Sequence, residues 1–155
     1  MALFDSIVVG TDGSDTAREA VRRAVDLARA LGARLQVVSA YEPVAETAAP
    51  APVAREDEAG ASAADAQWTV APREGVDAIL DDVAAVARAA GGEAEVHARQ
   101  GSPADAILDV AEETGADLIV VGNKGMTGAE RFLLGSVPNK VSHHAPCSVL
   151  IVRTT

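Results

Sequence analysis

The sequence has only one cysteine, Cys147, which excludes a disulfide within the chain and a metal site built from cysteines. We interpret Cys147 as a small apolar filler ahead of a predicted strand rather than as a nucleophile. Aromatic residues make up only 3% of the 155 residues, so Ala, Val, Leu and Ile must build the core. That composition is typical of helices packed on a buried parallel sheet.

Long apolar runs and basic charge are also scarce. No run of 18 apolar residues occurs, and the start, MALFDSIVVG, contains no basic residue. We therefore expect no membrane span, no export signal and a cytoplasmic location. The net charge of −10 argues against a general surface for nucleic acid or acidic membranes.

What the chain does contain is an alternation of strand-like and helix-like spacing. A capping box of Thr16 and Glu19 predicts the start of the first helix, and Ser102 predicts the N-cap of a later one. Gly32 and Gly115 are expected to end these two helices. Strands are expected at 6–10, 33–41, 93–100, 116–122 and 148–153, and two further helices at about 76–90 and 136–144.

The stretch from about 42 to 71 breaks this pattern. It is rich in Ala and Pro, carries scattered acids and shows no steady period. We interpret it as a long, mobile, acidic excursion over one end of the sheet, because it holds too few large apolar groups to form a second domain.

The order of the elements predicts the fold class. Strands alternating with helices indicate one α/β domain over 1–155, a doubly wound five-stranded parallel sheet with helices on both faces. Ligands of such sheets bind beyond the carboxyl ends of the strands, where the strand order reverses.

A glycine-rich stretch, VVGNKGMTGAERFLLGS, follows the most apolar strand. Glycine lets the backbone turn tightly and leaves its N–H groups uncovered, and Gly135-Ser136 opens a short helix whose N-terminus attracts anions. The stretch lacks the Gly-Lys-Ser/Thr ending of a Walker A loop, and the first strand is followed by GTDGSD rather than G-x-G-x-x-G. The glycines therefore predict a phosphate site of another kind.

The spacing Gly122-x2-Gly125-x9-Gly135-Ser136 resembles the nucleotide-binding motif of the universal stress protein family. Other parts of that family are similar to IVVGTDGSDTAREAV, GSPADAIL and GMTGAERFLLGSVPNKVSHHAPCSVLIVR. The similarity covers nearly the whole chain except the Ala/Pro-rich excursion. The resemblance implies the strand order 3-2-1-4-5 and a homodimer formed through the last strand, Ser148–Arg153.

The same resemblance implies which residues hold a nucleotide. The residues expected to bind ribose and phosphates, mainly through main-chain amides and the Ser136 hydroxyl, are Gly122, Gly125, Gly135 and Ser136, with Val137 beside them. Asp12 is expected near ribose and adenine, and Thr11 and Ala40 are expected to line the adenine slot. Lys124 is given a supporting phosphate contact, and Asn123, at a variable position of the motif, is given no role.

Members of the family that keep the glycine motif bind ATP, so the resemblance implies an ATP-binding regulator of stress or dormancy, with Mg²⁺ as a possible companion of the ATP. Similarity to actinobacterial members leaves cyclic AMP open as the alternative ligand, in which case the protein would act as a second-messenger buffer. Slow ATP hydrolysis also stays open. We expect no catalytic residues and no metal site, and the sequence names no regulatory protein partner.

Other functions have less support. His143 and His144 are adjacent on a predicted helix and so point apart, which disfavours joint metal binding. The chain has neither the Ser-Gly-Gly-x-Asp-Ser loop nor the His-x-x-His signature of related ATP-using enzymes. A phospho-receiver domain needs an acidic pair after the first strand, where Asp12 stands alone.

Overall fold

The computed structural model describes residues 3–42, 71–123 and 134–154. The predicted excursion, apart from its two ends, and the motif residues Lys124 and Gly125 lie outside the described residues.

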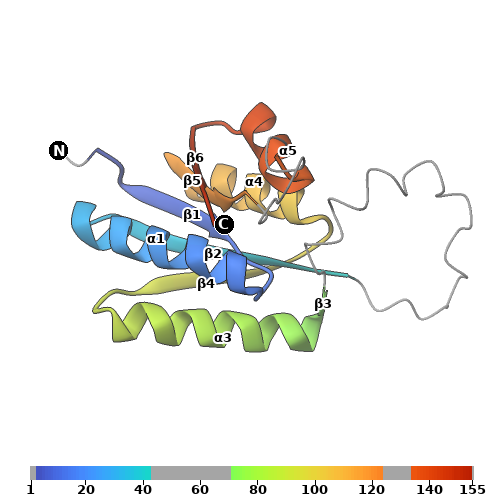
Figure 1. Ribbon diagram of the computed structural model, residues 1–155, viewed down its shortest axis with the longest axis horizontal. Coiled ribbons are helices and arrows are strands. Elements are labelled where there is room, and N and C mark those ends of the chain that lie inside the picture. The colour runs from blue at the N-terminus through green and yellow to red at the C-terminus, as the bar shows by residue number, and fades with distance from the viewer. Residues whose placement is uncertain (1–2, 43–70, 124–133, 155) are drawn as a thin grey trace, which may run out of the picture.

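A parallel sheet forms the centre of the molecule (Figure 1). Its five longer strands stand in the order β4-β2-β1-β5-β6, which is 3-2-1-4-5 when they are numbered along the chain, as predicted. All of the neighbouring pairs are parallel. The strands are β1 (Ser6–Gly10), β2 (Arg34–Glu42), β4 (Ala94–Gln100), β5 (Leu118–Gly122) and β6 (Ser148–Val152).

Helices cover both faces of this sheet, so that it is doubly wound. One face packs against α1 (Asp15–Leu31) and α3 (Arg73–Ala89), and the other against α4 (Pro103–Thr114) and α5 (Ser136–His144). The two faces have separate apolar clusters because successive side chains of a strand point to opposite sides. In β1, Ile7 and Val9 face α1, and Val8, between them, faces α4.

The first helix begins earlier than the capping box predicted. Ser14 is the N-cap of α1, and its Oγ accepts a hydrogen bond from the Ala17 N–H at 3.2 Å. Glu19 does not reach back to the helix start, because its carboxylate pairs with Arg22 and Arg23 at 3.3 and 3.2 Å. The prediction of Thr16 as the cap was therefore wrong. Ser14 takes the position because its own backbone is extended, with ψ of 163°, and lies one residue before the helix.

The other predicted helix ends are confirmed. Ser102 caps α4 through its Oγ, which accepts from the Asp105 N–H at 3.3 Å. Gly32 and Gly115 end α1 and α4 in the left-handed conformation, with φ of 66° and 64°. Glycine adopts that conformation without the steric cost a Cβ would impose.

A two-residue strand that the sequence did not predict, β3 (Ala71–Pro72), pairs with the end of β2. Beside it the Arg73 guanidinium donates to the Tyr41 hydroxyl at 3.1 Å and lies 4.8 Å from the centre of the Tyr41 ring. The last described residues before 43–70 and the first after it thus lie side by side.

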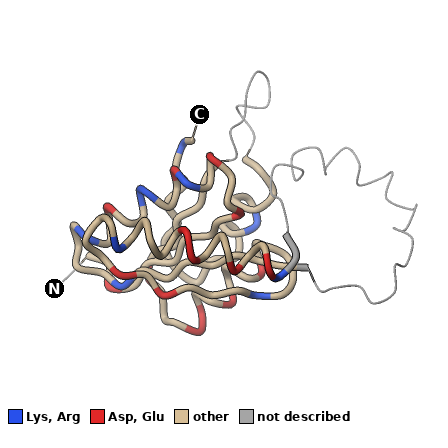
Figure 2. The backbone as a smooth tube through the Cα atoms, turned by 90° about the horizontal axis from the view of Figure 1, so that it is seen from below, with Lys and Arg blue, Asp and Glu red and all other residues tan. Residues whose placement is uncertain are grey.

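Charged residues are mixed over the described surface. In Figure 2 the Lys and Arg positions lie among the Asp and Glu positions rather than on a face of their own. Within residues 3–42, 71–123 and 134–154, no helix combines the length and apolar character that crossing a bilayer requires.

Candidate functional site

The central strand β1 is the first to leave the sheet at its carboxyl edge. Its pairing with β5 ends at Val9 and Val120, and its pairing with β2 ends at Gly10 and Val38. The outer pairs run further, β2 with β4 to Tyr41 and β5 with β6 to Gly122. The early departure of β1 leaves its two neighbours to flank its carboxyl end. This is also where the strand order reverses, the usual ligand position in open α/β sheets.

The turn after β1 places Thr11 and Asp12 at this point. The Thr11 N–H extends the sheet by donating to the Val38 carbonyl at 2.9 Å. The Thr11 hydroxyl then accepts from the Gly13 N–H at 3.1 Å, and Asp12 Oδ1 accepts from the Ser14 N–H at 2.9 Å. These local bonds fix the turn, and both side chains are buried. The buried side chains of Thr11 and Asp12 thus form a rigid polar surface at the end of the central strand.

Ala40 lies beside this polar surface, near the end of β2. It is 5% exposed, and its backbone pairs with Arg99 of β4 on one side. On the β1 side it lies beyond the last β1–β2 pair, and the next residue, Tyr41, pairs with β3 on the edge that β4 does not occupy. The small side chain of Ala40 suits contact with a flat group.

Gly122, at the end of β5, is enclosed by protein atoms. A Cβ at this position would lie 3.3 Å from Thr154 Cγ2 and 3.8 Å from both the Ala20 Cβ and the Thr16 carbonyl oxygen. A side chain here would therefore be tight against the Thr154 methyl group, while its distances to α1 would be those of ordinary contacts. The glycine thus has a packing role against Thr154 whether or not a ligand is bound.

The N-terminus of α5 has no side-chain cap, unlike those of α1 and α4. Gly135 occupies the N-cap position with an extended backbone, and the first bond within the helix runs from the Asn139 N–H to the Gly135 carbonyl at 3.0 Å. The N–H groups of Ser136 and Val137 therefore have no acceptor within the helix, while Pro138 carries no N–H. Ser136 is exposed and Val137 is buried. This helix end presents two main-chain donors and a hydroxyl, which suits a single phosphate group.

Seven of the nine predicted site residues can be placed. Thr11, Asp12, Ala40 and Gly122 lie at or near the carboxyl ends of strands, and Gly135, Ser136 and Val137 begin α5, the next described element after β5. The remaining two, Lys124 and Gly125, lie outside the described residues. Whether any of the nine binds a nucleotide stays a prediction.

The prediction that assigned Asn123 no role overlooked three hydrogen bonds. The Asn123 N–H donates to the Val152 carbonyl at 3.0 Å, and its Oδ1 accepts from the N–H and the Oγ1 of Thr154 at 3.0 and 2.9 Å. The only signal in the sequence is a short amide side chain directly after the strand-ending glycine.

Charged groups near the start of α4 connect it to α5. Lys140 Nζ lies 2.8 Å from Asp105 Oδ1, and Asp105 Oδ2 accepts from the Ser102 hydroxyl at 2.8 Å. The hydrogen bond from Lys140, followed by that from Ser102, lowers the pKa of Asp105 below its ordinary value. The bridge joins the helix that carries the Ser136 and Val137 amides to its neighbour.

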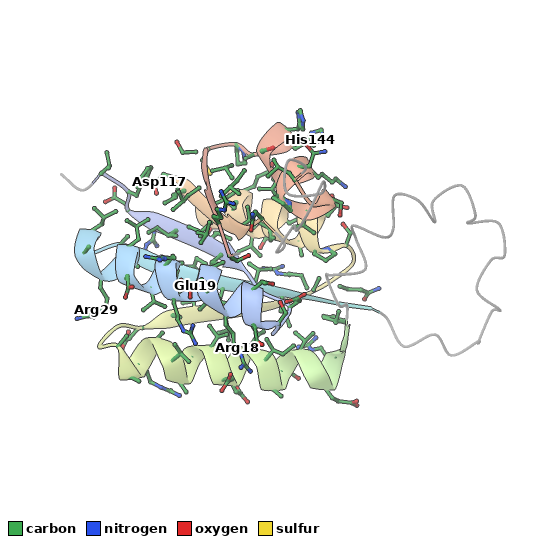
Figure 3. All side chains as sticks on the ribbon, viewed as in Figure 1. Arg18, Glu19, Arg29, Asp117 and His144 are labelled. Carbon is green, nitrogen blue, oxygen red and sulfur yellow. The ribbon has the colours of Figure 1, made fainter. Side chains whose placement is uncertain are left out.

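Metal-binding groups do not gather in the described part of the chain. Among its His, Cys, Asp and Glu residues no three come together in a way that could hold an ion. His143 and His144 end α5 and are exposed, His144 at the outer tip of the helix (Figure 3). Burial, followed by the nearby Asp117 carboxylate, raises the pKa of the Cys147 thiol, which makes it a poorer nucleophile.

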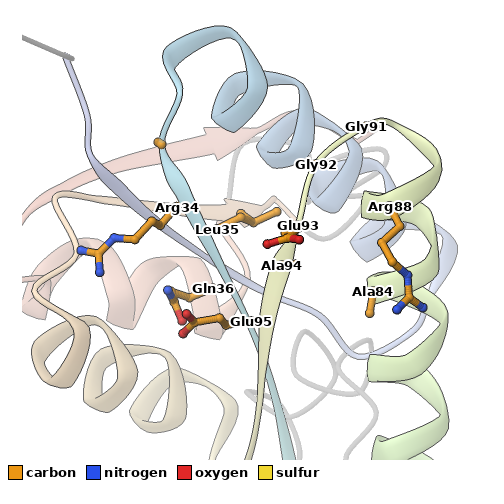
Figure 4. A pocket seen from close by; sticks show the side chains of 11 residues that line it. Arg34, Leu35, Gln36, Ala84, Arg88, Gly91, Gly92, Glu93, Ala94 and Glu95 are labelled. Carbon is orange, nitrogen blue, oxygen red and sulfur yellow. The ribbon is translucent and has the colours of Figure 1, made fainter.

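An open groove of about 690 Å³ lies at the opposite, amino edge of the sheet (Figure 4). The starts of β2 and β4 and the end of α3 line it, with Arg34, Arg88 and Glu95 among its side chains. It is larger than a single phosphate needs but has charges of both signs around its rim. The carboxyl edge remains the better candidate, because the buried Thr11 and Asp12 follow the central strand there and α5, which begins without a side-chain cap, is the next described element after β5.

Comparison with known proteins gives consistent matches. Residues 3–153 match the universal stress protein family. A universal stress protein of Mycobacterium tuberculosis is 40% identical over 156 residues, covering 100% of both chains. The crystal structure of a universal stress protein in complex with cAMP has a TM-score of 0.71 and 35% identity, again covering 100% of both chains. The structure of the universal stress protein from Archaeoglobus fulgidus in complex with dAMP has a TM-score of 0.62 and 26% identity, covering 97% of this chain and 98% of that one.

Proposed function

The chain belongs to the universal stress protein family, and from that premise we propose that it is a regulatory protein that binds an adenine nucleotide at the carboxyl edge of its sheet. The adenine would lie against Ala40 and the Thr11–Asp12 turn. The phosphate would accept hydrogen bonds from the Ser136 and Val137 amides.

The observation that carries this proposal is the uncapped start of α5. In α1 and α4 a serine hydroxyl satisfies an N-terminal amide, but at α5 the cap is Gly135, which has no side chain to do so. An anionic oxygen can take that place, and the positive end of the helix dipole favours it. The residues present therefore fit a phosphate group.

Cyclic AMP is the first candidate ligand. Its single phosphate matches the two amide donors at this helix start, and relatives have been solved with cAMP and with dAMP, both of which carry one phosphate. ATP is the second candidate, supported by the Gly122-x2-Gly125-x9-Gly135-Ser136 motif. In that case the longer phosphate chain would use Lys124 and Gly125 as well, with Mg²⁺ as a companion ion.

Calorimetric titration with cAMP and ATP, each with and without Mg²⁺, tests the proposal on protein first shown to be free of nucleotide. We expect cAMP to bind more tightly, while tighter ATP binding would make the protein an ATP sensor. Removing the Ser136 hydroxyl with Ser136→Ala should weaken ATP more than cAMP if ATP uses more of this helix end. The absence of binding by either ligand would leave a protein-interaction module as the function.

Gly135→Asp separates binding from folding. Its carboxylate would cap the Val137 amide, so the helix should stay as stable, and it would repel a phosphate in the same position. We expect an unchanged or slightly higher thermal midpoint together with loss of nucleotide binding. Unchanged binding would remove the α5 terminus from the site.

We further propose that the protein does not turn nucleotide over efficiently, that it forms a homodimer through β6, and that it acts in the cytoplasm. The sequence lacks the motifs of related ATP-using enzymes, which supports the first point. Leu150, 41% exposed on the edge strand β6, supports the second, because an open apolar strand edge favours pairing. A phosphate-release assay with ATP and Mg²⁺ tests the absence of turnover, which a rate that saturates with ATP and is lost in Gly135→Asp would contradict.

A further inference from the structure

The hydrogen-bond ladder between β5 and β6 ends at Asn123 in an unusual way. β5 and β6 pair in parallel through Gly122 and Val152, and the Asn123 N–H continues this ladder by donating to the Val152 carbonyl at 3.0 Å. In a parallel ladder the next bond would run from the Thr154 N–H to the main-chain carbonyl of Asn123. Here the Thr154 N–H instead reaches the side-chain carbonyl, Asn123 Oδ1, at 3.0 Å.

The Asn123 side chain thereby takes the place of one main-chain acceptor between β5 and β6. Because Oδ1 satisfies the Thr154 N–H, that donor is paired even though the regular β5–β6 pairing ends at Gly122 and Val152. The same Oδ1 also accepts from Thr154 Oγ1 at 2.9 Å, so that two donors of one residue hold it. Three hydrogen bonds between the end of β5 and the C-terminal residues form a unit that we call the Asn123–Thr154 clip.

The clip also sets the surroundings of Gly122. Thr154 Cγ2 lies 3.3 Å from the point where a Gly122 Cβ would be, so the methyl group of Thr154 packs directly on this glycine. The same point lies 3.8 Å from the Ala20 Cβ of α1, which is an ordinary contact distance. The clip thus fixes Gly122 and Asn123 at the end of β5, next to the carboxyl end of β1.

We propose that Asn123 is a positioning residue of the nucleotide site, which acts through Thr154 and without touching the ligand. This inference rests on the proposed function. It also links the site to the residues that directly follow β6, so that occupancy of the carboxyl edge and the order of the C-terminal residues depend on each other.

The test compares three variants of the full chain. Asn123→Ala removes the acceptor of both Thr154 donors, Thr154→Val removes only the hydroxyl donor and keeps the shape, and Thr114→Val is the matched control. Thr114 Oγ1 donates to the Val110 carbonyl at 2.7 Å within α4, so the control loses a comparable hydroxyl bond away from the carboxyl edge.

The measurements are the dissociation constants for cAMP and ATP by calorimetry and the thermal midpoint without ligand. We expect Thr154→Val, which loses one hydrogen bond to Oδ1, to weaken the tighter ligand about threefold, and Asn123→Ala, which loses both, about tenfold. Thr114→Val should lower the thermal midpoint as much as Thr154→Val does and leave affinity unchanged. Amide exchange should show that Thr154 loses its protection in Asn123→Ala.

The outcomes separate the two proposals. Wild-type protein that binds neither nucleotide overturns the proposed function and this inference with it. Wild-type protein that binds, with Asn123→Ala and Thr154→Val binding equally well, overturns the inference alone and reduces the clip to a structural role. If Asn123→Ala proves too unstable to assay, a threefold loss in Thr154→Val against none in Thr114→Val still supports the proposal, and equal affinities overturn it.

Discussion

Lys140 of α5 and Asp105 of α4 form an ion pair with 2.8 Å between Nζ and Oδ1. Since α5 carries the Ser136 and Val137 amides, which have no acceptor within the helix, this pair helps to hold the phosphate-binding end of the proposed site against α4. It is solvent-accessible on both sides, with side-chain exposures of 47% and 57%, and its contribution to stability is correspondingly small.

Lys140→Met should raise the pKa of Asp105 toward its ordinary value, because the hydrogen bond from Lys140 is the main cause that lowers it. A lowered carboxyl pKa in the folded state adds stability above the unfolded pKa, which is lost as pH falls through the folded pKa. The variant should therefore lose less stability between pH 5 and about pH 3 than the wild type. Carbon-detected nuclear magnetic resonance titration of the Asp105 carboxyl measures the shift, with Lys140→Arg as the control that keeps it.

Ser14→Ala should lower the free energy of unfolding by about 1 kcal/mol, because it removes the N-cap of α1. Ser136→Ala is the matched comparison, since Ser136 follows the N-cap of α5 and no side chain caps that helix. Chemical denaturation should show a loss in the first variant and almost none in the second. Almost no loss in Ser14→Ala would mean that Thr16 or another residue takes over the cap.

Stability should also depend on His97, whose Nε2 lies 2.6 Å from Oε1 of Gln36, a side chain that is only 1% exposed. Burial, and then the charge of Arg99, lower the pKa of His97, although Glu95 and Glu113 act in the opposite direction. The unfolded chain therefore binds a proton at a higher pH than the folded chain does.

This difference in proton binding sets the direction in which the stability of the fold changes with pH. Stability should be fully present above about pH 6.5, the unfolded value, and fall as pH decreases toward the lower folded pKa. Denaturation curves at pH 7.5, 6.5 and 5.5 measure the slope, and His97→Asn should flatten it. An unchanged slope in His97→Asn would mean that other groups produce the pH dependence.

Leu150→Lys should convert the proposed dimer into a monomer, because it places a charge on the apolar edge of β6. Val86 on α3 has the same exposed fraction, 41%, and lies away from that edge, so Val86→Lys is the control. Sedimentation equilibrium should give the mass of one chain for the first variant and that of two for the second. A wild-type protein that sediments as a monomer would contradict the dimer itself.

Much of the fold could be predicted because its signals are local. The apolar run Ser6–Gly10 and the helix Ser136–His144 have the predicted bounds, and Ser102 and Gly115 delimit α4 as expected. The capping box failed because Ser14 and Thr16 are both suitable caps, and only the backbone conformation before Asp15 distinguishes them. The two-residue β3 could not be predicted, since it depends on Tyr41 and Arg73 meeting across a long segment.

The candidate site likewise has features that local sequence predicts and features that only the tertiary structure reveals. The glycine spacing indicated a phosphate site, and the order of elements indicated the carboxyl edge of the sheet. The packing of Gly122 against α1 and Thr154 gives this glycine a second role, which spacing cannot reveal. The three bonds of Asn123 connect residues about thirty positions apart, and no local pattern marks them.

By itself, the sequence determined the type and order of the helices and strands, because periodicity, caps and glycine ends act over a few residues. It also determined the glycine motif and, through it, the family. Tertiary structure decided which groups meet: Asn123 with Thr154, Lys140 with Asp105, and Gln36 with His97. Those contacts depend on the register of strands brought together by crossovers, and register is fixed by the packing of both sheet faces at once, which no single stretch of sequence contains.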